Sequence, residues 1–185
     1  ISFDRLNGVI ECESGVLLSE VLEVCVPQGY FLYVTPGTKF ISVGGAIASD
    51  VHGKNHHTEG CFVECVLSFK IMDEKGVILN CSREENSDKF WATIGGMGLT
   101  GIILSAKIKL KNIESAYIRQ ESIKAENLSE IFRLFEESED WTYTVAWIDC
   151  LQKGKNIGRS ILMRGEHALK VELPFKLADK PLRLK

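Results

Sequence analysis

Apolar and polar residues alternate along several stretches of the chain, and this pattern predicts short β-strands. The clearest alternation spans residues 63–72 and 102–110, where every second side chain is apolar. Weaker alternation bounded by turn residues predicts further strands at 9–13, 31–34, 77–79, 117–123, 142–148 and 160–163. Strands separated by single helices predict a mixed α+β protein.

Helical spacing of apolar residues occurs early in the chain. Residues 16–26 place apolar side chains on one face, and Pro27-Gln28-Gly29 ends the segment. This face consists of Leu17, Leu18, Val21, Leu22 and Cys25. A shorter helix is expected through Phe90, Trp91 and Ile94, capped by Asn86 or Ser87.

Composition changes near residues 111–114, and we predict a domain boundary there that separates residues 1–112 from 113–185. The second part is expected to contain a strand, a helix and two further strands, forming one incomplete α+β layer. Asn127 followed by Glu130 resembles a capping box at the start of that helix. The apolar face predicted for it consists of Leu128, Ile131, Phe132 and Phe135.

Glycine and small residues concentrate between residues 34 and 57. Pro36-Gly37 predicts a turn, because proline fixes φ and glycine tolerates unusual backbone angles. Gly44-Gly45 removes side chains from the start of a segment that is predicted helical at 46–49. Exposed N–H groups at such a helix start would attract an anion. The simpler interpretation is a tight turn packed on a sheet.

A second glycine-rich segment, residues 95–101, matches the pattern Gly-x-Gly-x-x-Gly. The dinucleotide fingerprint requires a strand before this pattern and a helix after it. Here a helix precedes and a strand follows, so we reject a doubly wound nucleotide-binding fold. A bulged connection that passes close to a ligand or to another strand is the better interpretation.

Taken together, the segments Thr35–Thr38, Val43–Ala48, Asp50–His57 and Phe90–Ile103 resemble the PCMH-type FAD-binding domain of the vanillyl-alcohol-oxidase superfamily. Within that superfamily they are most similar to the decaprenylphosphoryl-ribose 2-oxidase branch. Residues 143–149 resemble the start of the branch's substrate domain. The resemblance implies that residues 1–112 form the second α+β subdomain of the FAD-binding domain and that residues 113–185 begin a substrate (cap) domain. The chain is then expected to be a fragment.

The resemblance also implies an activity. FAD would accept a hydride from a secondary alcohol of a sugar or polyprenyl-phospho-sugar, and a reductase partner could complete an epimerisation. Cofactor contacts carry over to Thr35, Pro36, Gly37, Thr38, Ser42, Gly44, Gly45, Ala46, Ser49, His52, Gly53, Gly98, Thr100, Gly101 and Ile102. Ser49 departs from the branch, where a cysteine is common. The histidine that attaches flavin covalently in related oxidases lies upstream of the matched segments, so the linkage stays open.

His52 and Lys54 are the catalytic candidates implied by the resemblance, which places them at the isoalloxazine end of the flavin. A cation there would stabilise the negative charge of reduced flavin. The choice between the two residues stays open. Two simpler interpretations also stay open: His52 could bond a backbone carbonyl of the turn, and Lys54 could be a solvated loop lysine.

Two alternatives to a flavoenzyme remain. The chain could be a non-catalytic α+β module that binds a nucleotide or a protein partner. It could also be a zinc-stabilised domain, but the His52/His56 and Cys61/Cys65 spacings match no common zinc site, and we expect no metal. The remaining residues in that region that could ligate a metal are Asp50, His57 and Glu59.

Composition narrows the function further. A net charge of −3 gives no basic surface for nucleic acid, and no apolar run has the length of a membrane span. Six scattered cysteines are typical of reduced, mostly buried thiols in an intracellular protein. We therefore expect a cytoplasmic location, which includes a peripheral position at a membrane surface. The alternating aromatic residues Tyr143 and Trp147 are typical of a strand that faces a core.

Overall fold

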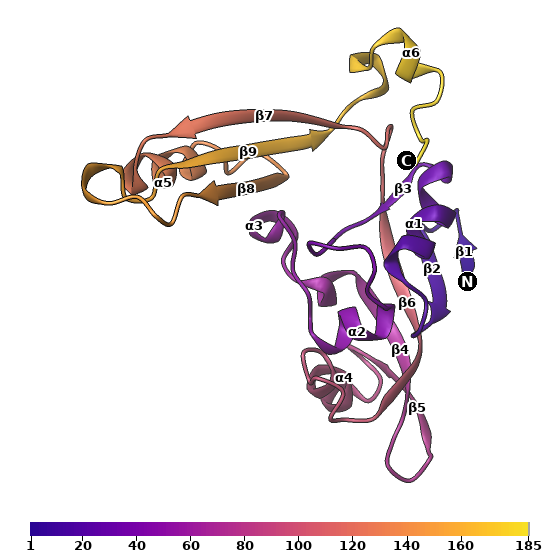
Figure 1. Cartoon of the computed structure of the whole chain (residues 1–185). Helices are drawn as coiled ribbons and strands as arrows, with labels where there is room; N and C mark the ends of the chain where they lie inside the picture. Colours follow the sequence, from indigo (N-terminus) through magenta and orange to yellow (C-terminus); the bar gives the residue numbers. More distant parts are fainter. Residues whose placement is uncertain (185) are drawn as a thin grey trace. The chain divides into compact units, whose positions relative to one another are not determined.

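The fold was analysed in a computed structural model, which describes residues 1–184. The chain divides into two compact units. The first comprises Ile1–Ile113 together with a short stretch from Leu182 onward, and the second comprises Glu114–Pro181. Each unit has its own sheet (Figure 1).

The first unit is built on an antiparallel sheet with the order β1-β2-β6-β4-β5, and β3 pairs with the end of β6. The central strand β6 is long enough to pair with β2 along Ser105–Lys109 and with β3 along Leu110–Asn112. The strands are β1 (Ser2–Asp4), β2 (Val9–Glu13), β3 (Tyr30–Leu32), β4 (Val66–Met72), β5 (Ile78–Ser82) and β6 (Ile102–Asn112).

Short helices connect these strands. They are α1 (Leu18–Cys25), η1 (Val26–Gln28), α2 (Val43–Ala48), α3 (His56–Glu59), η2 (Phe62–Cys65) and α4 (Ser87–Thr93). The amphipathic pattern of residues 16–26 is confirmed, because the apolar face of α1 is buried. Gly29 in the left-handed conformation ends η1 after the proline.

Two predicted elements of this unit differ in detail. The strand predicted from residue 63 begins only at Val66, because Phe62–Cys65 forms a 3-10 turn that buries Cys65 without pairing. Asn86 precedes α4 but does not cap it through its side chain. Its φ is 48°, and its amide donates to the Asn80 carbonyl (2.7 Å).

The second unit contains a three-stranded antiparallel sheet with the order β7-β9-β8 and one long helix, α5. The sequence order strand, helix, strand, strand is as predicted. The elements are β7 (Ile118–Ala125), α5 (Leu128–Glu136), β8 (Tyr143–Ile148), η3 (Gly154–Asn156), β9 (Ser160–His167), η4 (Lys170–Glu172) and α6 (Phe175–Ala178).

Helix α5 packs on the sheet with a face that matches the predicted one only in part, since Ile131 and Phe135 contact the core as predicted. Ile131 and Leu134 are buried against Leu162, whereas Phe132 is 59% exposed and Leu128 43% exposed. The Asn127 side chain accepts the Glu130 N–H (3.0 Å) as predicted. The Glu130 carboxylate instead accepts the N–H of Glu126, so the reciprocal half of the capping box is absent.

Both units combine helices with antiparallel sheets, which confirms the α+β class. Within residues 1–184, no helix has the length and apolar content needed to cross a membrane.

Candidate functional site

The two glycine-rich segments meet in the first unit. The Gly95 N–H donates to the Ile47 carbonyl (3.1 Å), and the Met97 N–H donates to the Ala48 carbonyl (2.8 Å). The end of α2 and the loop after α4 are therefore joined through their backbones, although about fifty residues separate them in the sequence.

An open cavity of about 380 Å³ lies where these segments meet. Six of its lining residues were predicted as cofactor contacts: Ser42, Gly44, Gly45, Ser49, Gly98 and Gly101. The sequence reasoning missed five others, namely Ser14, Gly15, Ala48, Met97 and Ile103. Its wall consists of glycines, serine hydroxyls, Ala48 and two larger apolar side chains, Met97 and Ile103, and none of the described residues places a carboxylate there.

Ser14 and Gly15 belong to the cavity because α2 begins directly beside them. The Gly44 N–H donates to the Ser14 carbonyl (2.8 Å), and a Cβ at Gly44 would lie 2.9 Å from the Ser14 Cβ. No local pattern at Ser14-Gly15 indicates a site. Met97 has a φ of 52°, which is uncommon for a non-glycine residue.

The expectation of an anion site at the start of α2 is wrong, because the N–H groups of the first residues of this helix already have acceptors. Val43 donates to the Val16 carbonyl (2.8 Å), and Gly44 donates to Ser14. Gly45 donates to the Ser42 Oγ (3.1 Å). The Ala46 N–H bonds the Ser42 carbonyl (2.9 Å), and the Ala46 side chain is completely buried, so a ligand cannot reach it.

The turn at Pro36-Gly37 does offer backbone donors. Within the described chain, no acceptor takes the N–H groups of Gly37, Thr38 and Lys39. Gly37 has open space where a Cβ would lie. Three successive unpaired N–H groups in a turn can form a concave donor site for an anion.

The remaining predicted contacts lie outside the residues that line the cavity. Thr35 packs its carbonyl against Gly53, where a Cβ would lie only 2.5 Å away. The Thr100 Oγ1 is hydrogen bonded to the Thr93 Oγ1 (2.9 Å), which holds the loop before β6. Ile102 is 60% exposed at the start of β6.

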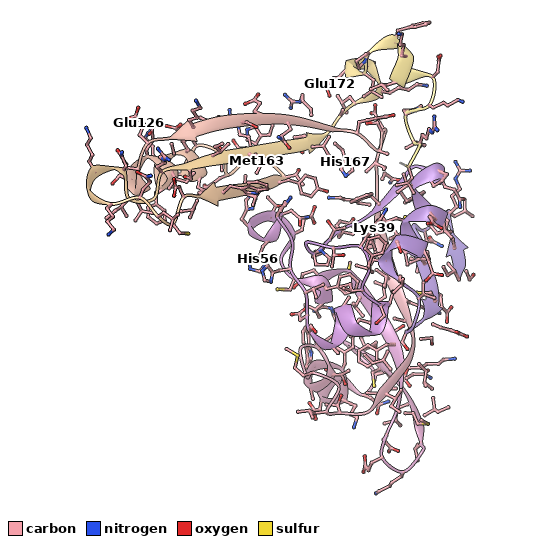
Figure 2. All side chains as sticks on the ribbon, in the orientation of Figure 1. Lys39, His56, Glu126, Met163, His167 and Glu172 are labelled. Atoms are coloured by element: carbon pink, nitrogen blue, oxygen red, sulfur yellow. The ribbon has the colours of Figure 1, made fainter. Side chains whose placement is uncertain are left out.

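His52 and Lys54 both have exposed side chains. The His52 ring lies edge-to-face against His56 (5.6 Å between centroids), which projects from α3 (Figure 2). Lys54 forms no ion pair with any residue that the structure describes. Both side chains are therefore available to a ligand.

The zinc alternative receives no geometric support. Within residues 1–184, no three His, Cys, Asp or Glu side chains come together as a metal site. The Cys61 Sγ lies 3.7 Å from the His56 Nδ1, but the Cys65 thiol is buried and donates to the Phe62 carbonyl (3.1 Å). Burial raises the pKa of Cys65 to about 12, so it stays a neutral thiol. All six cysteines are free, and four are buried: Cys12, Cys25, Cys65 and Cys81.

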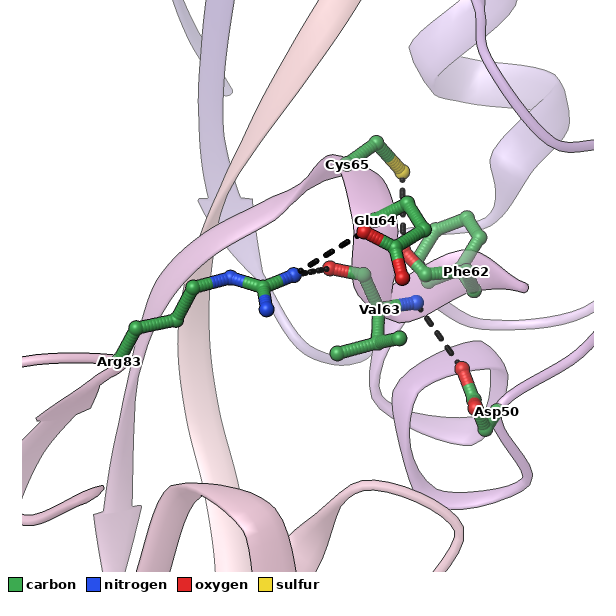
Figure 3. Close-up of polar contacts among 6 residues, drawn as sticks. All are labelled: Asp50, Phe62, Val63, Glu64, Cys65 and Arg83. Atoms are coloured by element: carbon green, nitrogen blue, oxygen red, sulfur yellow. Dashed lines mark hydrogen bonds and ion pairs between the residues drawn. The ribbon is translucent and has the colours of Figure 1, made fainter. Parts of the chain in front are cut away.

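Asp50 has a structural role that its sequence position does not indicate. It adopts a φ of 41°, and its carboxylate accepts the Val63 N–H (2.9 Å). The Arg83 guanidinium donates to the Val63 carbonyl (3.1 Å) and contacts Glu64 (3.4 Å), as Figure 3 shows. The Asp50–Val63 bond thus joins the two ends of the loop that carries His52 and Lys54, and Arg83 holds Val63 from its carbonyl side.

The second unit contains a separate cavity of about 520 Å³ where β7 and β8 end and β9 begins. Trp147 lines this cavity and is 73% exposed, so the expectation that it faces a core is wrong. It projects from the sheet face opposite α5, because its neighbours Ala146 and Leu162 belong to the α5 core. Tyr143 is partly buried at the other end of β8.

Comparison with known proteins identifies an FAD-binding family profile and several related proteins. Residues 1–82 match the family profile described as FAD binding domain. The chain is 36% identical to decaprenylphosphoryl-beta-D-ribose oxidase of Mycolicibacterium smegmatis over 185 residues, covering 98% of this chain and 40% of the relative. It is 34% identical to a Streptomyces coelicolor protein named "Uncharacterized protein in mprA 5'region", covering 90% and 45% respectively.

A plant relative matches a shorter part of the chain. Cytokinin dehydrogenase 3 of Arabidopsis thaliana is 30% identical over 111 residues, covering 60% of this chain and 21% of the relative. The chain spans less than half the length of the curated relatives it matches.

The residues of the first unit fit a flavin nucleotide. The cavity is walled by glycines and hydroxyls and is free of acidic groups, and unpaired N–H groups are present at residues 37–39. Over residues 1–184, the zinc-bound alternative lacks a ligand cluster, and the antiparallel sheets do not fit a doubly wound fold. The chain therefore carries a PCMH-type FAD-binding domain of the FAD-linked oxidase family, and its cofactor is FAD.

Proposed function

We propose that the whole protein oxidises a secondary alcohol of a sugar or polyprenyl-phospho-sugar and that FAD takes up the hydride. The observation that carries this proposal is the backbone junction of the two glycine-rich segments at a cavity lined by small residues. The substrate class comes from the name of the mycobacterial relative, which specifies decaprenylphosphoryl-ribose. That relative aligns with nearly the whole chain.

The first unit would hold the cofactor in this proposal. The N–H groups of Gly37, Thr38 and Lys39 are free to donate to phosphate or ribityl oxygens. Ser42, Ser49 and the glycines of the cavity would let the nucleotide lie against the main chain. Bound FAD supplies the acceptor for the hydride.

His52 and Lys54 would provide positive charge next to the flavin ring. Positive charge already in place where negative charge develops stabilises the transition state without reorganisation. Lys54 suits this role because its side chain is exposed and unpaired with any described carboxylate. His52 is the second candidate because its ring is also exposed.

The second unit would begin the substrate domain, with residues 1–112 assigned to flavin binding and 113–185 to the start of the cap. The proposal extends to a reductase partner that completes an epimerisation and to a cytoplasmic enzyme working at a membrane surface. A lipid-linked substrate would lie at a membrane surface, and reduction of the oxidised sugar carbon from its other face would give the epimer.

The test uses the full-length protein. It is purified and denatured, and the supernatant is examined for the absorption spectrum and mass of FAD. The native protein is then mixed without oxygen with candidate sugar alcohols, and bleaching of the flavin absorption is followed. Finding no flavin in the purified protein would refute the proposal.

A matched pair of variants tests the catalytic assignment. Lys54→Met should slow alcohol-dependent bleaching by roughly 10²-fold or more, as expected for the loss of a preset charge. Lys75→Met, at the exposed turn between β4 and β5, should leave bleaching unchanged. Equal rates in the two variants would remove Lys54 from the catalytic machinery.

A further inference from the structure

Asn55 is completely buried, although it follows an exposed turn and begins an exposed helix. His52 and Lys54 precede it with solvent-accessible side chains, and α3 contains no buried residue. A buried amide in such surroundings needs a structural reason, because asparagine is mostly exposed in folded proteins.

The Asn55 side chain connects this turn to the segment after β3. Its Nδ2 donates to the Tyr33 carbonyl (2.6 Å). The backbone carbonyl of Asn55 accepts hydrogen bonds from the N–H groups of Thr58 (3.1 Å) and Glu59 (2.8 Å) and from the Thr58 hydroxyl (3.0 Å). Asn55 therefore stabilises the first turn of α3 through its backbone and binds the segment after β3 through its side chain.

Gly53 lies between the two segments that Asn55 connects. A Cβ at Gly53 would lie 2.5 Å from the Thr35 carbonyl oxygen and 2.9 Å from the Asn55 Oδ1. The turn at residues 52–54 and the segment at 35–38 are thus in direct main-chain contact. Both segments are part of the proposed flavin site, and Asn55 is the buried polar side chain beneath their junction.

The Asn55 Oδ1 is buried and has no hydrogen-bond partner among the described residues. An unsatisfied buried acceptor reduces the stability of the fold, so a buried asparagine here is less favourable than an apolar side chain of similar size would be. The compensating feature is the single donor bond to Tyr33, which an apolar residue of similar size could not form.

We propose that Asn55 is a positioning residue for the flavin site. It acts by holding His52, Gly53 and Lys54 at a fixed distance from the Thr35–Thr38 turn. The inference rests on the proposed function, because it takes these two segments as the walls that receive FAD. Asn55 itself would touch neither flavin nor substrate.

The test uses Asn55→Asp in the full-length protein, since this change keeps the shape and makes the donor depend on pH. A protonated carboxyl can donate to the Tyr33 carbonyl, whereas an ionised carboxylate cannot and is repelled by it. Burial raises the pKa of a carboxyl group, which brings this switch toward neutral pH. FAD affinity, measured by flavin fluorescence on titrating apoprotein, should be close to wild type at pH 5 and on the order of tenfold weaker at pH 8.

Asn86→Asp is the matched control. The Asn86 amide also donates to a backbone carbonyl, that of Asn80 (2.7 Å), but it is exposed and lies before α4. This variant should bind FAD like wild type at both pH values. A second readout is the midpoint potential of bound flavin, which should shift in Asn55→Asp at pH 8 because His52 and Lys54 are displaced.

Several results would overturn the inference. One is an Asn55→Asp protein whose FAD affinity and flavin potential match wild type at pH 8. Another is an affinity loss of the same size at pH 5 and pH 8, or a variant that folds at neither pH, since each assigns Asn55 to fold stability alone. Failure of the wild-type protein to bind FAD would refute the proposed function instead, and the two failures are distinguishable for that reason.

Discussion

Gly101 shows how one residue shapes the site. Its φ is 141°, and a Cβ there would lie 2.4 Å from the Met72 carbonyl oxygen. The close approach lets the loop before β6 pass directly into pairing with β4 and exposes Ile102 beside the cavity. The sequence placed a bulged glycine connection here, but it could not name the strand that the backbone approaches.

We predict that Gly101→Ala lowers the free energy of unfolding by about 2–4 kcal/mol, because the methyl group collides with main chain at an unfavourable φ. Denaturant unfolding monitored by circular dichroism would measure the change. Gly37→Ala serves as the control, since nothing lies within 4 Å of its Cβ position, and it should change stability by less than about 1 kcal/mol. Similar losses in the two variants would contradict the packing argument.

At the scale of elements, α5 shows the limit of a helical pattern. The spacing correctly predicted a helix capped by Asn127, but two of the four residues assigned to its buried face, Leu128 and Phe132, are exposed. The apolar residues of α5 can form either of two overlapping faces along the helix, and only packing against the sheet determines which face is buried. Ile131 and Leu134 belong to the face that contacts Leu162.

Ile131→Ala should therefore reduce the unfolding free energy by about 2–4 kcal/mol through the cavity it leaves. Phe132→Ala should cost less than about 1 kcal/mol, because the ring is mostly in solvent. Thermal unfolding of both variants under identical conditions tests the assignment, and the opposite order would show that α5 is rotated about its axis.

The turn between β4 and β5 is closed by an acidic side chain. The Asp73 carboxylate accepts the N–H groups of Lys75 and Val77 (both 2.9 Å). The Val77 bond is the larger favourable cause, and together these bonds lower the pKa of Asp73 below its usual 3.8. The folded protein thus binds a proton at this site less readily than the unfolded chain does.

A group with a lowered folded pKa stabilises the fold above its unfolded pKa, and this stabilisation is lost as the pH falls through the folded value. The unfolding free energy of wild type should therefore exceed that of Asp73→Ala at pH 6, and the difference should shrink below about pH 4. Urea unfolding of both proteins between pH 2 and pH 7 measures it. A difference that stays constant across this range would show that the carboxylate bonds do not contribute.

At the scale of the whole molecule, FAD binding should change exchange rates in two distant parts of the sequence. The N–H groups of residues 37–39 have no acceptor in the described structure, so their amides should exchange quickly in the apoprotein. Adding FAD to the full-length apoprotein should slow exchange there and at residues 95–101. Hydrogen–deuterium exchange with mass spectrometry would measure the effect.

Residues 73–77 at the β4–β5 turn provide the internal reference for that experiment, since they lie outside the cavity lining. Protection confined to residues 95–101, with none at residues 37–39, would remove the Gly37–Lys39 amides from the cofactor site. Protection of equal size at the reference turn would indicate general stiffening rather than binding.

The sequence by itself determined the α+β class, most strand positions and the two glycine-rich segments that mark the FAD-binding family. These features are local, because strand alternation, proline and glycine act on the few residues around them. It also ruled out the dinucleotide fingerprint, since the order of helix and strand around a motif can be read along the chain.

Only the tertiary structure decided which backbone groups of the site are free. The donors at the start of α2 are taken by the Val16 and Ser14 carbonyls, which lie about thirty residues earlier, so the anion site expected there is absent. The same long-range pairing brought Ser14 and Gly15 to the cavity and buried Asn55 beneath the turn. A backbone N–H is available to a ligand only if no other carbonyl accepts its hydrogen bond. A carbonyl that is distant in the sequence cannot be inferred from the residue pattern of one segment.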